Sequence, residues 1–260
     1  TTGYGELLFN RALHADYHTV ETVAHAHAAT RYVPNASFIL DIGGQDMKAI
    51  WLSDGIIGNI VVNEACSSGC GSFLENFAQT LGIPTPEIAD AAFTSQQPAV
   101  LGSRCTVFMN SSIVSEQKNG RTPADIMAGL CRSIIANVFT KVVRVPNLDS
   151  LGRHIVVQGG TFRNDAVLCA LEQHIGRPVT RAPYPGLMGA IGVALLTREH
   201  MTKQAGEQAK QAACKADSHT PAPASSTFIG FDALGALSYR QHANVACPFC
   251  ANRCNRTVIA

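Results

Sequence analysis

The chain has 260 residues and a formal net charge of +1, and 46% of its residues are hydrophobic while 15% are charged. This composition supplies a sizeable core and argues against a disordered chain. The balanced charge argues against electrostatic binding to a strongly charged partner, so we predict neither a nucleic-acid nor a membrane partner.

The first 63 residues combine a helix with a small sheet. Apolar and helix-favouring residues predict a helix over 13–32, ended before Pro34. Three strands are predicted within 38–63. The pair Asp54-Gly55 between the second and third strands is typical of a two-residue hairpin turn.

The middle of the chain alternates helices with short apolar strands, which is the pattern of an α/β fold. Thr122 followed by Pro123 is a typical helix start, with a capping residue and proline at the first helical position. We predict further helices over 71–81, 165–175 and 186–196, and strands over 105–109, 154–157 and 179–182.

The C-terminal part has a different composition. Residues 198–227 are predicted to form a polar helix and a linker rich in proline and serine, and residues 228–260 a Cys-rich tail. So short a tail has no self-sufficient core without a metal or a partner. It carries a C-x₂-C-x₃-C pattern that suits an iron–sulfur cluster or Zn²⁺, with His242 or a cysteine beyond Ala260 as the candidates for the fourth ligand. Three unrelated thiols are the alternative. The three cysteines are Cys247, Cys250 and Cys254.

The cysteine count bears on the cellular compartment. Nine cysteines are an odd number, and the start of the chain has no signal-peptide pattern, so a disulfide framework is not expected. We predict reduced thiols in an oxygen-poor cytoplasm, some of them ligating metal. The chain begins at Thr1 without a methionine, so we expect it to be a piece of a longer protein.

Two glycine turns predict a nucleotide site. Residues 41–46 (DIGGQD) place two glycines at a strand end, where backbone amides reach phosphate oxygens. Asp41 and Asp46 are placed to hold Mg²⁺ or to orient an attacking water. A second pair, Gly159-Gly160, follows another apolar strand. Either pair alone is also compatible with an ordinary tight turn. Together they predict a nucleotide held from two sides.

We interpret four histidines near the N-terminus as part of a solvated surface and not as a metal site. They lie at helical spacing on a polar stretch where no cysteine or carboxylate set converges by sequence, so a solvated helix face is expected. They are His14, His18, His25 and His27.

Five sequence motifs occur in order along the chain, at 41–46 (DIGGQD), 63–73 (NEACSSGCGSF), 103–108 (SRCTVF), 159–164 (GGTFRN) and 186–192 (GLMGAIG). In this order they resemble the motifs of the BadF/BadG/BcrA/BcrD ATPase family. Its members include activators of 2-hydroxyacyl-CoA dehydratases and ATP-driven benzoyl-CoA reductase subunits. The resemblance covers residues 1–197.

The resemblance implies an α/β fold of the actin/Hsp70/sugar-kinase (ribonuclease H-like) ATPase class. No counterpart of the family's first phosphate motif is present, so the resemblance implies an N-terminally truncated fold. Residues 1–37 would be a remnant of the first subdomain, and 38–197 the second. The catalytic residues implied are Asp41 and Asp46, and the ATP-binding residues implied are Gly43, Gly44, Gln45, Gly69, Gly71, Gly159, Gly160 and Asn164.

Cys66 and Cys105 are the cluster ligands that the resemblance implies. From their spacing alone, two buried thiols remain the alternative. Two thiolates are half of the ligands of a 4Fe-4S cluster, and a two-fold dimer supplies the other half. Cys70 makes the motif resemble a longer, multidomain, activase-related subgroup, in which a second ATPase domain of the same protein is the other possible partner. Cys70 itself is expected beside the cluster ligands, near the nucleotide.

The predicted function is an ATPase coupled to electron transfer. A dimer-bridging 4Fe-4S cluster would pass a low-potential electron to a 2-hydroxyacyl-CoA dehydratase or related reductase, with ATP/ADP and Mg²⁺ as the other cofactors. A small-molecule kinase of the same fold is one alternative, although it has no use for Cys66 and Cys105. A non-catalytic metal-binding interaction module is the other, and failure of the full-length protein to hydrolyse ATP would favour it.

Overall fold

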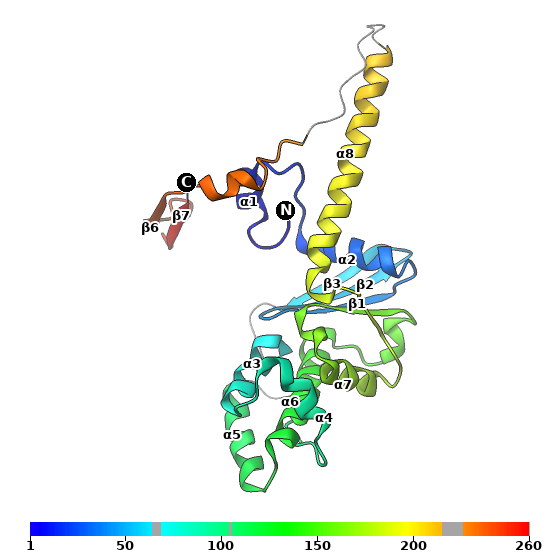
Figure 1. Cartoon of the computed structure of the whole chain (residues 1–260), viewed down its shortest axis with the longest axis vertical. Helices are drawn as coiled ribbons and strands as arrows, with labels where there is room; N and C mark the ends of the chain where they lie inside the picture. Colours follow the sequence, from blue (N-terminus) through cyan, green and yellow to red (C-terminus); the bar gives the residue numbers. More distant parts are fainter. Residues whose placement is uncertain (64–68, 104–105, 215–225, 260) are drawn as a thin grey trace.

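The computed structural model describes residues 1–63, 69–103, 106–214 and 226–259. Figure 1 shows three layers, with a central sheet between one pair of helices and a larger group of helices, and with the long helix α8 projecting from the body. Cys66 and Cys105 lie outside the described residues.

The sheet has five strands in the order β3-β2-β1-β4-β5. β1 pairs antiparallel with β2 and parallel with β4, so β1 and β4 end at the same edge. β2 is antiparallel to β3, and β4 is parallel to β5. The strands are β1 Phe38–Ile42, β2 Met47–Ser53, β3 Ile56–Asn63, β4 Ile155–Gln158 and β5 Thr180–Arg181.

The predicted hairpin turn is confirmed. Asp54 and Gly55 both have positive φ angles, 51° and 78°, as the two central residues of a type I′ turn require. The turn joins β2 to β3 in antiparallel register, with Ser53 opposite Ile56.

The larger part of the core covers one face of the sheet. Phe38, Leu40 and Ile42 alternate along β1 and point into it, because successive side chains of a strand face opposite sides. The opposing helices are α3 Gly71–Thr80, α4 Ile88–Phe93, α6 Pro123–Val138 and α7 Asp165–Ile175.

α6 begins as predicted. Thr122 and Asp125 form a capping box with a proline at the first turn, and a π-helical turn, Phe139–Val143, follows the helix. Within the described residues, Pro123–Val143 is the one helical stretch long and apolar enough to span a bilayer, and 78% of its most apolar window is buried in the protein. This segment is therefore a core helix of the fold.

α2 Glu21–Tyr32 and α8 Met188–Cys214 cover the opposite face. A Cβ at Gly192 would lie 1.8 Å from the backbone oxygen of Ala24, so only glycine permits this close crossing. α8 continues through residue 197 without a break. The predicted helix over 186–196 and the polar stretch that follows it are one element.

Two element predictions are wrong. The predicted helix over 13–32 is shorter: α1 Glu6–Leu13 ends where it should begin, His14 closes α1 in the left-handed conformation, and α2 begins only at Glu21. Of the predicted strand over 105–109, residues 106–109 instead begin α5 Thr106–Lys118, and residue 105 lies outside the described residues. Short apolar runs carry no periodicity that separates a strand from a buried helical turn.

The remaining elements are short or lie in the tail. Thr227 bonds Asp16 through its backbone amide, and the amide of Ile229 donates to Leu13, so the tail begins beside α1. The elements are η2 Thr85–Glu87, η4 Leu148–Leu151, η5 Gly160–Arg163, η6 Pro185–Leu187, η7 Asp232–Ala236, β6 Gln241–Ala246 and β7 Asn255–Ile259.

Candidate functional site

A cavity of about 1090 Å³ lies at the carboxyl ends of β1 and β4. Both predicted glycine turns line it, because the two parallel strands end at one edge of the sheet. Such an edge is where open α/β sheets bind ligands. Asp41, Asp46 and Gln45 also line the cavity, as do residues of α2 and the start of α8.

The backbone around both turns is tightly arranged. The Gly43 amide donates to the carbonyl of Asp46 over 2.9 Å, and the Gly159 amide donates to the carbonyl of Pro185 over 2.7 Å. Gly159 has φ 91°, and a Cβ there would meet the backbone oxygen of Ile42 at 2.2 Å. Glycine is therefore required where the second turn passes the end of β1.

Asp41 is the most deeply buried of the acidic residues that line the cavity. Its side chain is 4% exposed, its Oδ2 lies 3.8 Å from Lys48 Nζ and its Oδ1 lies 3.8 Å from His25 Nδ1. Oδ1 is buried and has no hydrogen-bond partner among the described residues. Burial raises the pKa of Asp41, and the charges of His25 and Lys48 oppose that rise. A carboxylate that lines a cavity and has an oxygen without a partner suits Mg²⁺ or an oriented water.

A buried lysine contacts the acidic residues that line the cavity. Lys48 lies directly opposite Asp41 across the β1–β2 pair. Its Nζ is 2.9 Å from Glu21 Oε1 and also bonds Asp46, and its side chain is 4% exposed. Burial disfavours the ammonium, but the hydrogen bonds to Asp46 and Glu21 outweigh it and raise the pKa of Lys48. The sequence analysis missed this lysine.

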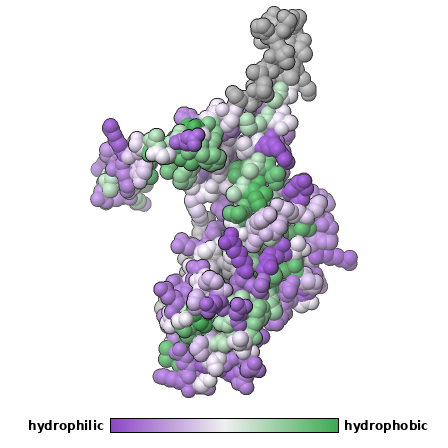
Figure 2. Space-filling view, in the orientation of Figure 1, coloured by the Kyte–Doolittle hydropathy of each residue, from purple (hydrophilic) through white to green (hydrophobic). Residues whose placement is uncertain are grey.

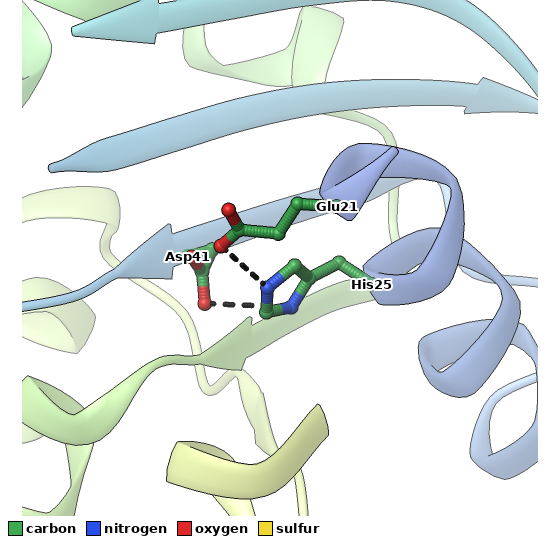
Figure 3. A group of neighbouring side chains, drawn as sticks. All are labelled: Glu21, His25 and Asp41. Carbon is green, nitrogen blue, oxygen red and sulfur yellow. Dashed lines mark hydrogen bonds and ion pairs between the residues drawn. The ribbon is translucent and has the colours of Figure 1, made fainter. Parts of the chain in front are cut away.

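Figure 3 shows Glu21 and His25 reaching from α2 toward Asp41 at the end of β1. His25 Nε2 is 3.2 Å from Glu21 Oε1, and this contact, followed by those of Lys48, lowers the pKa of Glu21 to about 2. Burial disfavours the imidazolium, but Glu21 and Asp41 outweigh it and raise the pKa of His25.

His25 also connects the two turns. Its Nδ1 lies 2.6 Å from the side-chain amide of Gln158, the last residue of β4. Gln158 Oε1 has no partner among the described residues. Exchanging the amide oxygen and nitrogen of Gln158 lets Oε1 accept from a protonated Nδ1 and leaves the amide nitrogen in the position without a partner among the described residues.

The prediction of a solvated face is wrong for His25, which is 8% exposed. α2 packs its inner side on the sheet, and the residues of that side are buried. The pairing of Glu21 with a histidine four residues later was the available signal. His14 and His18 are exposed as predicted, and His27 lies 3.1 Å from Glu199.

The ligand atoms of Glu21, His25 and Asp41 lie within 4.8 Å of one another, the distance range of a metal site. The Lys48 ammonium, however, already lies against Glu21 and Asp41. A second cation among these three atoms would be repelled at close range. We therefore interpret the group as a charged support for Asp41.

Replacing Lys48 with methionine tests this support. We expect Lys48→Met to lower the free energy of unfolding by about 3 kcal/mol, because it leaves buried carboxylates without their cation. Chemical denaturation measures the change. The exposed Lys118 of α5 provides the control, since Lys118→Met is expected to change stability by less than about 0.5 kcal/mol. Equal effects of the two variants would contradict the assignment.

The first glycine turn is also joined to the cysteine-bearing segment. The amides of Gly71 and Ser72, the first residues of α3, donate to the carbonyls of Gly43 and Gly44, each over 2.9 Å. Thr161 Oγ1 donates to the same carbonyl of Gly43 over 2.9 Å. The start of α3 is thus hydrogen-bonded to the wall of the cavity.

Three predicted nucleotide residues do not line the cavity. Gly69 packs against Met47 and Val138, and Gly71 packs against Thr161 and the first turn. Asn164 caps α7, where its side-chain oxygen accepts from the amides of Ala166 and Val167. The other five do line it, namely Gly43, Gly44, Gln45, Gly159 and Gly160.

The predicted cysteine sites fall in two places. Cys66 and Cys105 are outside the described residues, while Cys70 is buried at the N-cap of α3. Cys247, Cys250 and Cys254 lie on the β6–β7 hairpin, where Cys247 is half-buried and the other two are exposed.

Residues 1–197 match the model of the BadF/BadG/BcrA/BcrD ATPase family. The chain is 32% identical over 202 residues to the (R)-2-hydroxyglutaryl-CoA dehydratase activating ATPase of Acidaminococcus fermentans, covering 78% of this chain and 75% of that protein. It is 34% identical to the activator of lactoyl-CoA dehydratase of Anaerotignum propionicum, with coverage of 78% and 76%.

Two solved structures are similar. The A. fermentans dehydratase component A superposes with a TM-score of 0.69 at 32% identity, covering 76% of this chain and 74% of that one. The activator of the 2-hydroxyisocaproyl-CoA dehydratase from Clostridium difficile with bound ADPNP superposes with a TM-score of 0.68 at 28% identity, covering 85% and 77%. These matches confirm the fold class predicted from the sequence.

Proposed function

This chain belongs to the BadF/BadG/BcrA/BcrD ATPase family, and from that premise we propose that it is part of an ATP-driven activator of a 2-hydroxyacyl-CoA dehydratase or related reductase. Relatives named as dehydratase activators and a relative with bound ADPNP support the proposal. We also propose a cytoplasmic location, because nine cysteines without an expected disulfide framework suit reduced thiols.

The cavity residues supply the nucleotide half of this function. The turn at Gly43 and Gly44 would bind phosphate oxygens, and the turn at Gly159 and Gly160 would bind the rest of the nucleotide from the other side. Asp41 would hold Mg²⁺ or orient the attacking water with its free Oδ1. Lys48 and His25 keep that carboxylate in place from the side of the sheet that α2 covers.

Cys66 and Cys105 would hold the redox centre. Their donor chemistry fits two of the four thiolates of a 4Fe-4S cluster, so the other two come from a second copy or a second ATPase domain. When bound, the cluster supplies one low-potential electron to the partner enzyme. The chemistry on the acyl-CoA belongs to that partner.

One observation supports a coupling between the nucleotide cavity and the proposed cluster site. The carbonyls of Gly43 and Gly44 accept hydrogen bonds from the first amides of α3, the helix that follows the segment containing Cys66. Any shift of the turn between nucleotide states is therefore transmitted to the start of α3 without an intermediate side chain. A ligand that binds one position of the turn more tightly shifts this equilibrium.

Gly71→Ala in the full-length protein tests the coupling. A Cβ at Gly71 would lie 2.7 Å from Thr161 Oγ1, so the helix start or the threonine must move. The measurement is the rate at which the chelator bathophenanthroline removes cluster iron under saturating MgATP and under saturating MgADP. We expect the ratio of the two rates to shrink by about threefold or more relative to the parent.

Gly206→Ala is the matched control, because a Cβ at Gly206 meets open space on α8. It should leave the ratio unchanged. An unchanged ratio in Gly71→Ala would contradict the coupling through α3. A parent protein that hydrolyses no ATP, or that shows equal rates with both nucleotides, would contradict the proposed function itself.

A further inference from the structure

The β6–β7 hairpin is folded without a hydrophobic core of its own. Of its strand residues only Val245 and Val258 are even half-buried. Figure 1 shows the hairpin apart from the sheet, and Figure 2 shows that end of the molecule as mostly hydrophilic. Because an isolated two-stranded hairpin is marginal in water, another source of stability is required.

The three cysteines lie at the closed end of the hairpin. The Cys247 amide donates to the carbonyl of Cys254 over 2.9 Å, which extends the strand pairing by one step and places these residues opposite each other. Cys250 lies in the loop between them, and its carbonyl accepts from the Arg253 amide over 3.3 Å. Arg253 has a φ of 43°, so the loop turns back sharply just before Cys254.

Two arginines lie in or next to this loop. The Arg256 guanidinium lies 5.3 Å from the centre of the Phe249 ring, a cation–π contact that joins the loop to β7. Arg253 precedes Cys254 directly. Three thiolates around one divalent cation carry a net charge of −1, and these two arginines offset it.

We infer that Cys247, Cys250 and Cys254 form a second metal site, which takes a thiophilic centre, either Zn²⁺ or the iron of an iron–sulfur cluster. Their sulfurs are not clustered within 4.8 Å, since Glu21, His25 and Asp41 are the trio that meets this limit among the described residues. Metal binding therefore requires the three sulfurs to move closer together. Each thiol that binds loses its proton to solvent, and the binding free energy stabilises the hairpin.

The structure disfavours His242 as the fourth ligand. His242 pairs with Val258 at the open end of the hairpin, five residues before Cys247, and the register shifts between His242 and Val245. The cysteines lie at the closed end, beyond the remaining residues of the strand, each of which adds at most about 3.3 Å. The fourth position is therefore left to sulfide, to water or to a side chain outside the hairpin.

The test uses the whole chain carrying Cys66→Ser and Cys105→Ser, which removes the proposed cluster ligands. After anaerobic purification, zinc, iron and acid-labile sulfide are measured per chain. We expect either about one zinc without sulfide, or iron with a similar amount of sulfide, which distinguishes the two centres. Adding Cys247→Ser, Cys250→Ser and Cys254→Ser should reduce the metal at least about tenfold.

Two controls keep the outcome specific. Cys169→Ser changes a cysteine outside the tail, and His242→Ala removes the excluded ligand, so both should retain the metal. Hydrogen exchange of residues 241–259 should slow when metal is added and quicken with a chelator. Absence of metal in the starting variant, or retention after the triple tail substitution, would overturn the site. Loss of metal in His242→Ala would overturn the ligand set.

Discussion

We expect Asp41→Asn to reduce ATP turnover of the full-length protein about a thousandfold, the scale on which a group acting on the reacting water or its metal contributes. The asparagine preserves the size of the side chain but removes the charge. Asp41 lines the cavity, and its buried Oδ1 has no hydrogen-bond partner among the described residues, so this side chain is the one placed to act on Mg²⁺ or water.

Steady-state phosphate release measures this loss, and iron analysis of the same samples should show that the cluster is retained. Asp149→Asn is the control, because Asp149 is exposed in η4, outside the residues that line the cavity. Its turnover should match the parent. Asp41→Asn with turnover within about threefold of the parent would remove Asp41 from the mechanism.

The second large effect concerns the redox centre. We expect either Cys66→Ser or Cys105→Ser to abolish the proposed bridging cluster in the full-length protein, since each subunit of the proposed dimer would contribute two of the four thiolates and serine is a poor ligand for iron in such clusters. Iron and sulfide at these positions should fall below about a tenth of the parent value after anaerobic purification.

Iron bound by the tail cysteines must not contribute to this measurement. Iron is therefore compared in a background carrying Cys247→Ser, Cys250→Ser and Cys254→Ser. Cys169→Ser is the matched control, because Cys169 is a half-buried cysteine of α7 and should leave the iron content unchanged. Full iron in either the Cys66→Ser or the Cys105→Ser protein would refute the cluster assignment.

Local signals in the sequence determined much of the framework. Asp54-Gly55 predicted a turn because only a few residue types adopt two successive left-handed conformations. Thr122 and Pro123 predicted the start of α6 because capping depends on neighbours within one helical turn. The two glycine turns predicted a shared nucleotide site, and the structure places both on one cavity.

Other features were decided only by tertiary structure. Lys48 and Asp41 are seven residues apart, and they face each other because of the strand register. His25 and Gln158 are far apart in the chain, and their contact exists because α2 crosses the sheet above the end of β4. Buried charges need partners, but the sequence does not state which side chains the packing brings together.

Tertiary contacts also give two motif residues a structural role that the sequence did not predict. Asn164 lies in a nucleotide motif, and its side chain caps α7 because the free amides of that helix start lie within reach. Gly71 lies in the motif at 63–73, and its lack of a side chain lets the start of α3 pass close to Thr161. The sequence by itself determined the turns, the helix starts and the family. Packing decided which groups surround Asp41 and how the cavity is joined to α3, because both depend on contacts between segments distant in the chain.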